Sequence, residues 1–142
     1  MRISDILRSK GSDVMTVSPE STVADLVALL SERRFGAAVV SDDGETLRGI
    51  VSERDVVSAL AQHGPGLLSL QVSEIMTEDV VTCRPDAQLV ELLGVMTERR
   101  FRHVPVVVDS RMQGLVSIGD IVKFRLDELS QERDQLEAYI HT

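Results

Sequence analysis

The chain has 142 residues, of which 43 % are hydrophobic and 27 % charged, and its net charge is −8. This length and composition are typical of one compact globular domain. The acidic charge and the scarcity of aromatic residues argue against binding to a nucleic-acid polymer, although a few local groups can still hold one small nucleotide. The single cysteine, Cys83, cannot form an internal disulfide, and no apolar run is long enough to span a membrane. We therefore expect a cytoplasmic protein without membrane contact.

The sequence repeats itself, and this repeat organises the chain. The matching blocks are residues 4–7 with 73–76, 13–19 with 79–85, 32–35 with 98–101, and 49–55 with 114–120. Four blocks in the same order indicate a tandem duplication. We therefore divide the chain into repeat 1 over residues 1–66, repeat 2 over residues 67–125 and an amphipathic C-terminal helix over residues 126–142.

The first elements of repeat 1 are an extended segment and a helix. Thr-x-x-Pro at residues 16–19 predicts the extended segment, because proline disfavours helix at the residue before it. Thr22 and Asp25 have the spacing of a capping box. The apolar residues that follow recur at helical spacing and predict the core face of the helix, and they are Val23, Leu26, Val27 and Leu30 in repeat 1 and Leu89, Leu92, Leu93 and Met96 in repeat 2.

The second half of each repeat predicts two strands and another helix. Apolar runs at 37–40 and 104–108 have the length and β-branched content of buried strands, and a second run ends at Ser52 or Ser117. Polar turns separate the two runs, a helix begins near Glu53 or Ile118, and the Gly-Pro-Gly at residues 64–66 is typical of a linker between repeats. The predicted fold is α/β, with the order strand, helix, strand, strand, helix in each copy.

The end of the chain predicts a long amphipathic helix. Its apolar residues recur at alternating steps of three and four, with Arg133 as an interruption, and they are Val122, Leu126, Leu129, Leu136 and Ile140. Such a stripe must be buried against another surface. Its own module, a second copy of the chain and a foreign partner are all open candidates.

The pattern Gly-hydrophobic-Val-Ser-x-x-Asp ends with Ser52 and Asp55 in repeat 1, and with Ser117 and Asp120 in repeat 2. One interpretation is structural, because serine and aspartate cap the first turn of a helix. The other is functional, because free N–H groups at a helix start bind phosphate and a carboxylate can accept hydrogen bonds from ribose hydroxyls. Arg54 is either a phosphate ligand or an exposed surface arginine.

Two glycines and one proline suggest where the chain or a ligand approaches closely. Gly49 and Gly114 begin the two copies of the pattern and lack a Cβ, which lets backbone or ligand come near. Repeat 2 has Arg-His-Val-Pro at residues 102–105, where Pro105 has no N–H to donate and suggests a strand edge or free carbonyl groups. Repeat 1 has Gly-Ala-Ala at residues 36–38 instead, so the two ligand sites should differ.

These motifs resemble those of the cystathionine-β-synthase (CBS) domain family. The chain is similar to a stand-alone tandem CBS pair (a Bateman module) of the small bacterial type over residues 1 to about 125. The resemblance implies two βαββα repeats about a pseudo-two-fold axis, a non-catalytic sensor, and a cleft between the repeats that binds AMP, ADP, ATP, S-adenosylmethionine or NAD. It also implies a homodimer and an unidentified regulated protein.

The resemblance also assigns roles to individual residues. Asp55 and Asp120 match the ribose-binding aspartate, and Ser52 and Ser117 match the hydroxyl on the phosphate side. The remaining candidates match positions that line the ligand or lie near its base, and they are Thr16, Pro19, Gly36, Ala37, Ala38, Arg54, Thr82, Pro85, Arg102, His103, Val104 and Pro105.

Two rival functions are an enzyme and a pure interaction module. The sequence has no His-Glu-x-x-His, Gly-x-Ser-x-Gly or Gly-x-Gly-x-x-Gly motif, and its three histidines have no metal-ligand spacing. We therefore expect no catalytic residue, no metal and no catalytic cofactor, and Cys83 is a small buried filler. An interaction module with degenerate ligand sites would act through dimerisation and the C-terminal helix. The two copies of Ser-x-x-Asp favour ligand binding.

Overall fold

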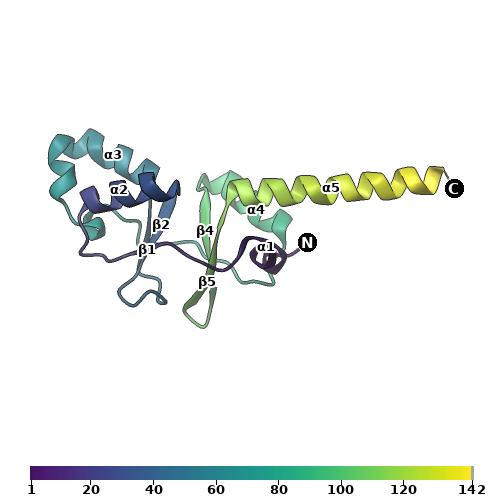
Figure 1. The fold of residues 1–142 in the computed structure, drawn as a ribbon, viewed down its shortest axis with the longest axis horizontal. Helices are drawn as coiled ribbons and strands as arrows, with labels where there is room; N and C mark the ends of the chain where they lie inside the picture. Colours follow the sequence, from purple (N-terminus) through teal and green to yellow (C-terminus); the bar gives the residue numbers. More distant parts are fainter. Residues whose placement is uncertain (142) are drawn as a thin grey trace. The chain divides into compact units, whose positions relative to one another are not determined.

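The computed structural model describes residues 1–141, which divide into two compact units (Figure 1). Unit 1 contains Met1–Ser12, Thr82–Val107 and the described chain from Gln113 onward, whereas unit 2 contains Asp13–Val81 and Val108–Met112. The fold is α/β with two repeats and a long C-terminal helix, as expected. The units do not follow the repeat boundaries, which stay a prediction.

Unit 2 is a three-stranded sheet covered by helices. Its elements are β1 (Thr16–Val17), α2 (Val23–Arg33), β2 (Ala37–Val40), β3 (Gly49–Ser52), α3 (Glu53–His63) and the 3-10 helices η1 (Gly64–Ser69) and η2 (Val72–Glu74). Strand β2 is central, parallel to β1 and antiparallel to β3, with Ala37 opposite Ser52. Helix α2 begins where the Thr22 hydroxyl accepts a hydrogen bond from the Asp25 N–H at 3.1 Å, as the sequence predicts.

Two details of unit 2 differ from expectation. Val27 is 36 % exposed and lies outside the core, although Val23, Leu26 and Leu30 of the same stripe are buried. The predicted linker is ordered, because residues 64–66 begin the 3-10 helix η1 and Leu67 in that helix packs with Val23 in a buried cluster. The connection is therefore part of the core of unit 2.

Unit 1 is built around a hairpin and three helices. Its elements are α1 (Ile3–Lys10), α4 (Leu89–Arg99), β4 (His103–Val108), β5 (Arg111–Ser117) and α5 (Ile118–Ile140). Strands β4 and β5 form the hairpin, and residues 108–112 at its tip belong to unit 2, where the Met112 N–H donates to the Glu45 carbonyl at 3.0 Å. The core includes Ile3 and Ile6 of α1 with Leu89, Leu92 and Met96 of α4, all buried.

The leading segment of each repeat, residues 4–7 or 73–76, packs on the other repeat. In unit 1, the Ser4 N–H near the start of repeat 1 donates to the Pro85 carbonyl of repeat 2 at 2.8 Å. In unit 2, the Ser73 N–H, at the matching position of repeat 2, donates to the Pro19 carbonyl of repeat 1 at 3.0 Å. Isolated bridges repeat the relation, with Arg2 opposite Gln88 and Thr22 opposite Gln71. The duplicated halves therefore exchange their leading segments.

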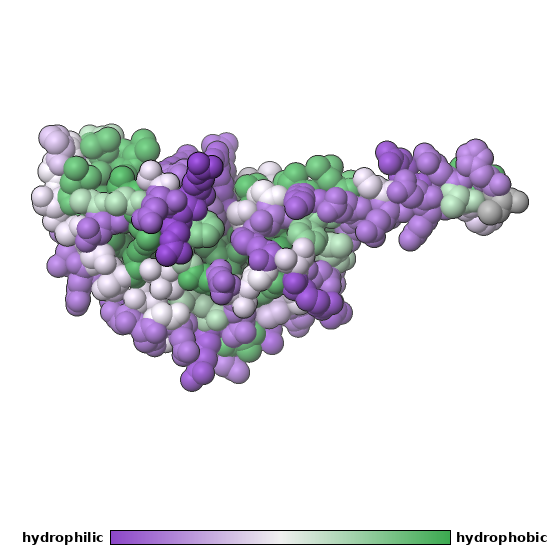
Figure 2. Space-filling model, viewed as in Figure 1, coloured by the Kyte–Doolittle hydropathy of each residue, from purple (hydrophilic) through white to green (hydrophobic). Residues whose placement is uncertain are grey.

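Helix α5 joins two predicted helices into one. No glycine or proline follows Gly119 in this region, so nothing interrupts the 23-residue helix between the predicted start at Ile118 and the predicted tail. Figure 1 shows α5 extending beyond the rest of unit 1. Figure 2 shows apolar surface over its first turns and a mainly hydrophilic distal half.

Candidate functional site: two strand-to-helix junctions

Junction 1 connects β3 to α3 and is a complete capping box. The Ser52 hydroxyl accepts a hydrogen bond from the Asp55 backbone N–H at 3.3 Å, and Asp55 Oδ2 accepts one from the Ser52 N–H at 2.8 Å. The Ser52 hydroxyl also lies 3.0 Å from the same oxygen. The Glu53 N–H donates to the Gly36 carbonyl at 2.9 Å, so Gly36 and Ala37 lie beside the serine.

Junction 2 connects β5 to α5 and repeats this geometry. The Ser117 hydroxyl accepts from the Asp120 N–H at 3.1 Å, and Asp120 Oδ2 accepts from the Ser117 N–H at 2.9 Å. The Ile118 N–H donates to the Arg102 carbonyl at 2.8 Å, as Glu53 does to Gly36. The interpretation of Ser-x-x-Asp as a helix cap is therefore confirmed in both repeats. The interpretation as a ligand site depends on the polar atoms that the caps do not use.

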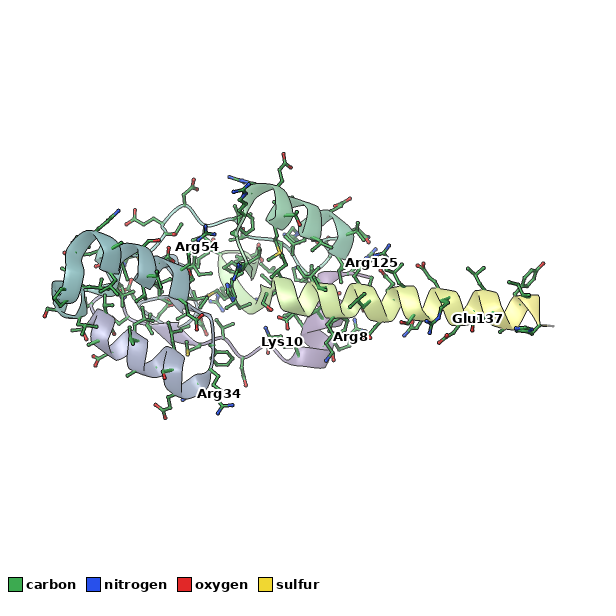
Figure 3. The ribbon with its side chains drawn as sticks, turned by 90° about the horizontal axis from the view of Figure 1, so that it is seen from above. Arg8, Lys10, Arg34, Arg54, Arg125 and Glu137 are labelled. Carbon is green, nitrogen blue, oxygen red and sulfur yellow. The ribbon has the colours of Figure 1, made fainter. Side chains whose placement is uncertain are left out.

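Lys10 distinguishes junction 2 from junction 1. Its Nζ lies 2.6 Å from Asp120 Oδ2 and donates to the Leu115 carbonyl at 2.8 Å (Figure 3 labels Lys10). Burial alone would raise the pKa of the Asp120 carboxyl, but hydrogen bonds from Lys10 and Ser117 and the lysine charge outweigh burial and lower it. Asp120 is therefore held as a carboxylate beside a cation.

Lys10 is a site residue that no sequence motif marks, and only a weak signal points to it. Lys10 lies in the connection before Thr-x-x-Pro, which is three residues longer in repeat 1 than in repeat 2. Within the shorter connection, residues 77–81 include Glu78 and Asp79 but no basic residue. The inserted residues were visible, but their contact with Asp120 spans the two repeats in sequence and follows only from the exchanged packing of α1.

The two pattern glycines are approached by protein. A Cβ on Gly49 would lie 2.8 Å from Met76 Sδ and 2.9 Å from the Thr77 carbonyl oxygen, and one on Gly114 would lie 2.5 Å from Leu7 Cδ2. Met76 and Leu7 hold matching positions in the exchanged leading segments. The close approach that these glycines permit is thus explained by packing inside each unit.

The Thr-x-x-Pro residues lie at the outer side of each sheet. Thr16 pairs with Val39 across β1 and β2, one strand away from β3, which carries Ser52. Pro19 is buried and Pro85 half-buried. The carbonyls of both prolines accept hydrogen bonds from the exchanged leading segments, at Ser73 and Ser4. Thr82 is exposed at the matching position of repeat 2.

The base-side candidates lie on the central strands. Ala37 and Ala38 on β2 and Val104 and Pro105 on β4 are buried, His103 is half-buried and Arg102 is exposed. A free carbonyl at Pro105 is a wrong expectation, because this carbonyl accepts from the Cys83 N–H at 3.1 Å where residues 82–83 run parallel to β4.

The remaining polar candidates lie apart from the junction caps. Arg54 is exposed in the first turn of α3 and has no ion pair among residues 1–141 (Figure 3). Cys83 is half-buried, and burial raises its pKa to about 11, which leaves the thiol protonated and unreactive at neutral pH.

In the part of the chain that the structure describes, no three His, Cys, Asp or Glu side chains gather as metal ligands, and no helix is long and apolar enough to cross a bilayer.

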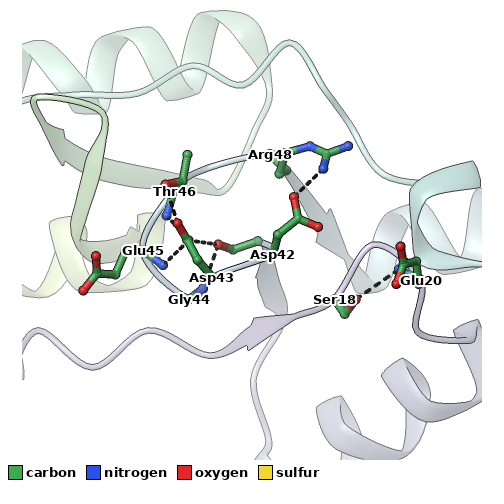
Figure 4. A network of polar contacts seen from close by, with 9 residues as sticks. Ser18, Glu20, Asp42, Asp43, Gly44, Glu45, Thr46 and Arg48 are labelled. Carbon is green, nitrogen blue, oxygen red and sulfur yellow. Dashed lines mark hydrogen bonds and ion pairs between the residues drawn. The ribbon is translucent and has the colours of Figure 1, made fainter.

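A network of polar contacts holds the loop between β2 and β3 (Figure 4). Asp43 accepts hydrogen bonds from the N–H groups of Thr46 and Glu45 at 2.7 and 2.8 Å, and from the Ser41 hydroxyl at 3.0 Å. The two backbone donors, with the hydroxyl groups, lower the pKa of the Asp43 carboxyl. Because this carboxylate is committed to the loop, it confirms the predicted turn and is not a ligand group.

Comparison with known proteins agrees with this architecture. The chain matches the CBS domain family over residues 3–62 and 72–127. A CBS-domain-containing protein from Agrobacterium tumefaciens has a solved structure that shares 41 % identity, covers 88 % of this chain and 99 % of its own, and superposes with a TM-score of 0.85. A mitochondrial CBS domain-containing protein of Arabidopsis thaliana is 36 % identical over 97 % of this chain and 71 % of its own.

Other solved relatives carry ligands or assemble. A CBS domain pair in complex with 5′-methylthioadenosine and S-adenosylmethionine shares 26 % identity, covers 87 % of this chain and 98 % of its own, and has a TM-score of 0.77. A hexameric CBS-CP12 protein from cyanobacteria shares 25 % identity, covers 97 % of this chain and 85 % of its own, and has a TM-score of 0.74. With both repeats matched and a stand-alone relative covered almost completely, this chain belongs to the CBS domain family as a tandem pair.

Proposed function

We propose that the chain is a non-catalytic regulatory module that binds an adenosyl ligand at its strand-to-helix junctions. The candidates are AMP, ADP and ATP, with NAD and S-adenosylmethionine as further adenosyl compounds. Each junction offers three groups, which are a carboxylate for ribose hydroxyls, a serine hydroxyl for phosphate and the backbone N–H of the second helical residue, Arg54 or Gly119. A CBS pair crystallised with two adenosyl compounds supports this ligand class.

The observation that carries the proposal is that each aspartate uses only one of its two carboxylate oxygens in the helix cap. Asp55 and Asp120 each commit Oδ2 to the capping box, and neither capping box uses Oδ1. A helix cap needs only one carboxylate oxygen. The second oxygen in each repeat is an acceptor that ribose hydroxyls can use without dismantling the cap.

Lys10 and Arg54 supply the positive charge that a phosphate needs. Lys10 lies against Asp120 at junction 2, and Arg54 follows Ser52 directly at junction 1. In the proposed complex, the ammonium of Lys10 stays on Oδ2 or turns to the phosphate, while the ribose uses Oδ1. The two junctions thus hold different cations for the same class of ligand.

Isothermal titration calorimetry with AMP, ATP and S-adenosylmethionine tests the proposal. Asp120→Ala removes an acceptor from the ribose and should weaken binding by roughly 5- to 150-fold, equivalent to about 1–3 kcal/mol. Asp55→Ala makes the same change at junction 1. Glu53→Ala, which removes an exposed side chain next to that cap and keeps the backbone N–H, is its matched control and should bind as the wild type does. Unchanged affinity for all three ligands in Asp120→Ala and in Asp55→Ala would refute the ribose role.

Arg54→Ala separates phosphate recognition from ribose recognition. This exposed side chain can be removed without disturbing the core, so the variant should lose affinity for AMP and ATP while adenosine binds as before. Equal losses for adenosine and for the nucleotides would remove Arg54 from the phosphate site.

The second candidate function is an interaction module, and the exposed apolar stripe on α5 favours it. A thermal-shift experiment distinguishes the two. A ligand at about one hundred times its Kd adds roughly 2.7 kcal/mol of stability, whereas an interaction module with degenerate junctions shows no shift with any adenosyl compound. In the sensor, the homodimer and an unidentified regulated protein would receive the signal.

A further inference from the structure

The apolar stripe of α5 faces away from the unit that α5 belongs to. Ile121 is buried against unit 1, and Phe124, Arg125 and Glu128 on the same side are half-buried. The stripe residues lie on another face and are exposed, with Val122 at 42 %, Leu126 at 59 %, Leu129 at 43 %, Leu136 at 63 % and Ile140 at 75 %. All described residues from Leu129 onward are exposed. A helical end with no tertiary packing is marginal in water.

The stripe has the spacing of a coiled-coil seam. Its steps alternate between four and three residues, which places Leu126, Arg133 and Ile140 at heptad position a and Val122, Leu129 and Leu136 at position d. At its proximal end lies an open apolar hollow of about 500 Å³, lined by Ile118, Gly119, Val122, Lys123, Leu126 and Asp127 of α5. The surface over these first turns is apolar in Figure 2.

We propose that the stripe pairs with the same stripe of a second copy in antiparallel orientation, with Leu126 facing Leu136 of the second copy. This register also places Val122 opposite Ile140 and Leu129 opposite Arg133 of the second copy. The distal end of each helix thereby fills the proximal hollow of the other. The contact is isologous and closes as a two-fold dimer.

The order of side chains selects this register. A shift by one heptad in one direction leaves Leu136 and Ile140 beyond the apolar part of the second helix. A shift in the other direction leaves Val122 and Leu126 uncovered. Only the proposed register covers all five apolar residues, so it buries the largest apolar area.

The charges select the antiparallel orientation. In a parallel pair, Arg133 would face Arg133 of the second copy in the seam, and Glu132 at position g would lie beside Glu137 at position e of the other helix. Both contacts are between like charges. The antiparallel register has one contact between like charges, Glu132 beside Glu132 of the second copy. It also moves Arg133 opposite Leu129 and places Lys123 beside Glu137 of the second copy, and the symmetry makes this ion pair twice, so attractive contacts outnumber repulsive ones. Figure 3 shows Glu137 on the distal part of α5 that this pairing would use.

A charge exchange measured by sedimentation equilibrium tests the pairing. Lys123→Glu and Glu137→Lys each turn two attractive contacts into two repulsive ones, and each should weaken the dimer by roughly tenfold. The double variant should restore the affinity. Because the two residues lie about 21 Å apart along one helix, restoration requires two chains. The pairing is overturned by singles that associate like the wild type, by a double as weak as the singles, or by a wild type that is monomeric at millimolar concentration.

Cross-linking tests the register independently. The proposed register brings Ser130 close to Ser130 of the second copy, whereas Gln131 lies on the outer side of the helix. Ser130→Cys should therefore be joined by a short bismaleimide much more efficiently than the matched control Gln131→Cys. Cys83 is common to both variants and half-buried. Equal cross-linking of the two variants would overturn the register. The pairing needs no ligand, so it can fail while the proposed function holds.

Discussion

Junction 1 and junction 2 contain the same helix cap, but different residues surround it. Both have the same reciprocal serine–aspartate cap, and in both the first helical N–H donates to a carbonyl at the start of the neighbouring strand. Among residues 1–141, only the aspartate of junction 2 forms an ion pair with a lysine. The difference comes from α1, which lies at the start of repeat 1 in sequence but packs with the helices and strands of repeat 2 in unit 1. The two repeats therefore share the cap, and their unequal leading segments give the two caps different charged neighbours.

The largest expected difference between the repeats concerns their glycines. Gly49→Ala pushes a methyl group against the Thr77 carbonyl, which is backbone and held by its own hydrogen bonds, whereas Gly114→Ala meets the end of the Leu7 side chain. We expect Gly49→Ala to cost about 2–3 kcal/mol of unfolding free energy and Gly114→Ala about 1 kcal/mol. Urea denaturation measures both. Equal losses would show that the two leading segments are equally rigid.

The lysine predicts a pH-dependent difference of intermediate size. The pKa of Asp120 is lowered from 3.8, so the stability that this carboxylate contributes is complete above the unfolded value and is lost as the pH falls through the folded value. Lys10→Met should therefore cost about 1 kcal/mol at neutral pH, because Lys10 and Asp120 are partly exposed. This cost should shrink as the pH falls below 3.8.

The matched control for Lys10 is Arg54→Met, which removes an exposed cation that has no ion pair among the described residues. Its unfolding free energy should differ from that of the wild type by a constant small amount over the same pH range. If Lys10→Met behaves in the same way in denaturation curves between pH 2 and 7, the Lys10–Asp120 contact contributes no stability.

The smallest effect is expected where the repeats agree. Arg34 and Arg100 end α2 and α4 with φ values of 57° and 59°, a left-handed conformation that disfavours side chains other than glycine. Each substitution to glycine should stabilise the protein by about 0.5 kcal/mol, after the entropy gained by the unfolded chain is deducted. Arg33→Gly, one residue earlier in α2, should instead destabilise by about 1 kcal/mol. A response in only one repeat would contradict the equivalence of the two helix ends.

Local patterns predicted most elements of this fold. The apolar run at residues 37–40 is β2 without change of bounds. Thr22 caps α2 as its spacing predicts, and the two Ser-x-x-Asp patterns form the helix caps that were one of their two interpretations. These features depend on neighbours within a few residues. The prediction of Val27 in the core is wrong, because an apolar stripe identifies the buried face of a helix but does not show how much of that face the neighbouring elements cover.

Long-range packing was not predictable from these patterns. Nothing in residues 4–7 indicates that they pack beside Pro85 and not beside Pro19, and the position of Lys10 depends on that choice. The apolar stripe predicts a helix at the end of the chain but does not show where the second helix of repeat 2 ends. In repeat 1 the corresponding helix ends at His63, where Gly64 follows. Repeat 2 lacks this glycine, so α5 continues.

The reciprocal packing of the leading segments bears on how the protein could have evolved and on whether its two repeats can fold separately. A single ancestral repeat with its own leading segment could complete its core by donating that segment to an identical neighbour, which is domain swapping between two chains. Fusion of two such genes would make the swap internal and permanent. Cutting the chain after residue 66 should then yield fragments that fold poorly alone but reassemble when they are expressed together.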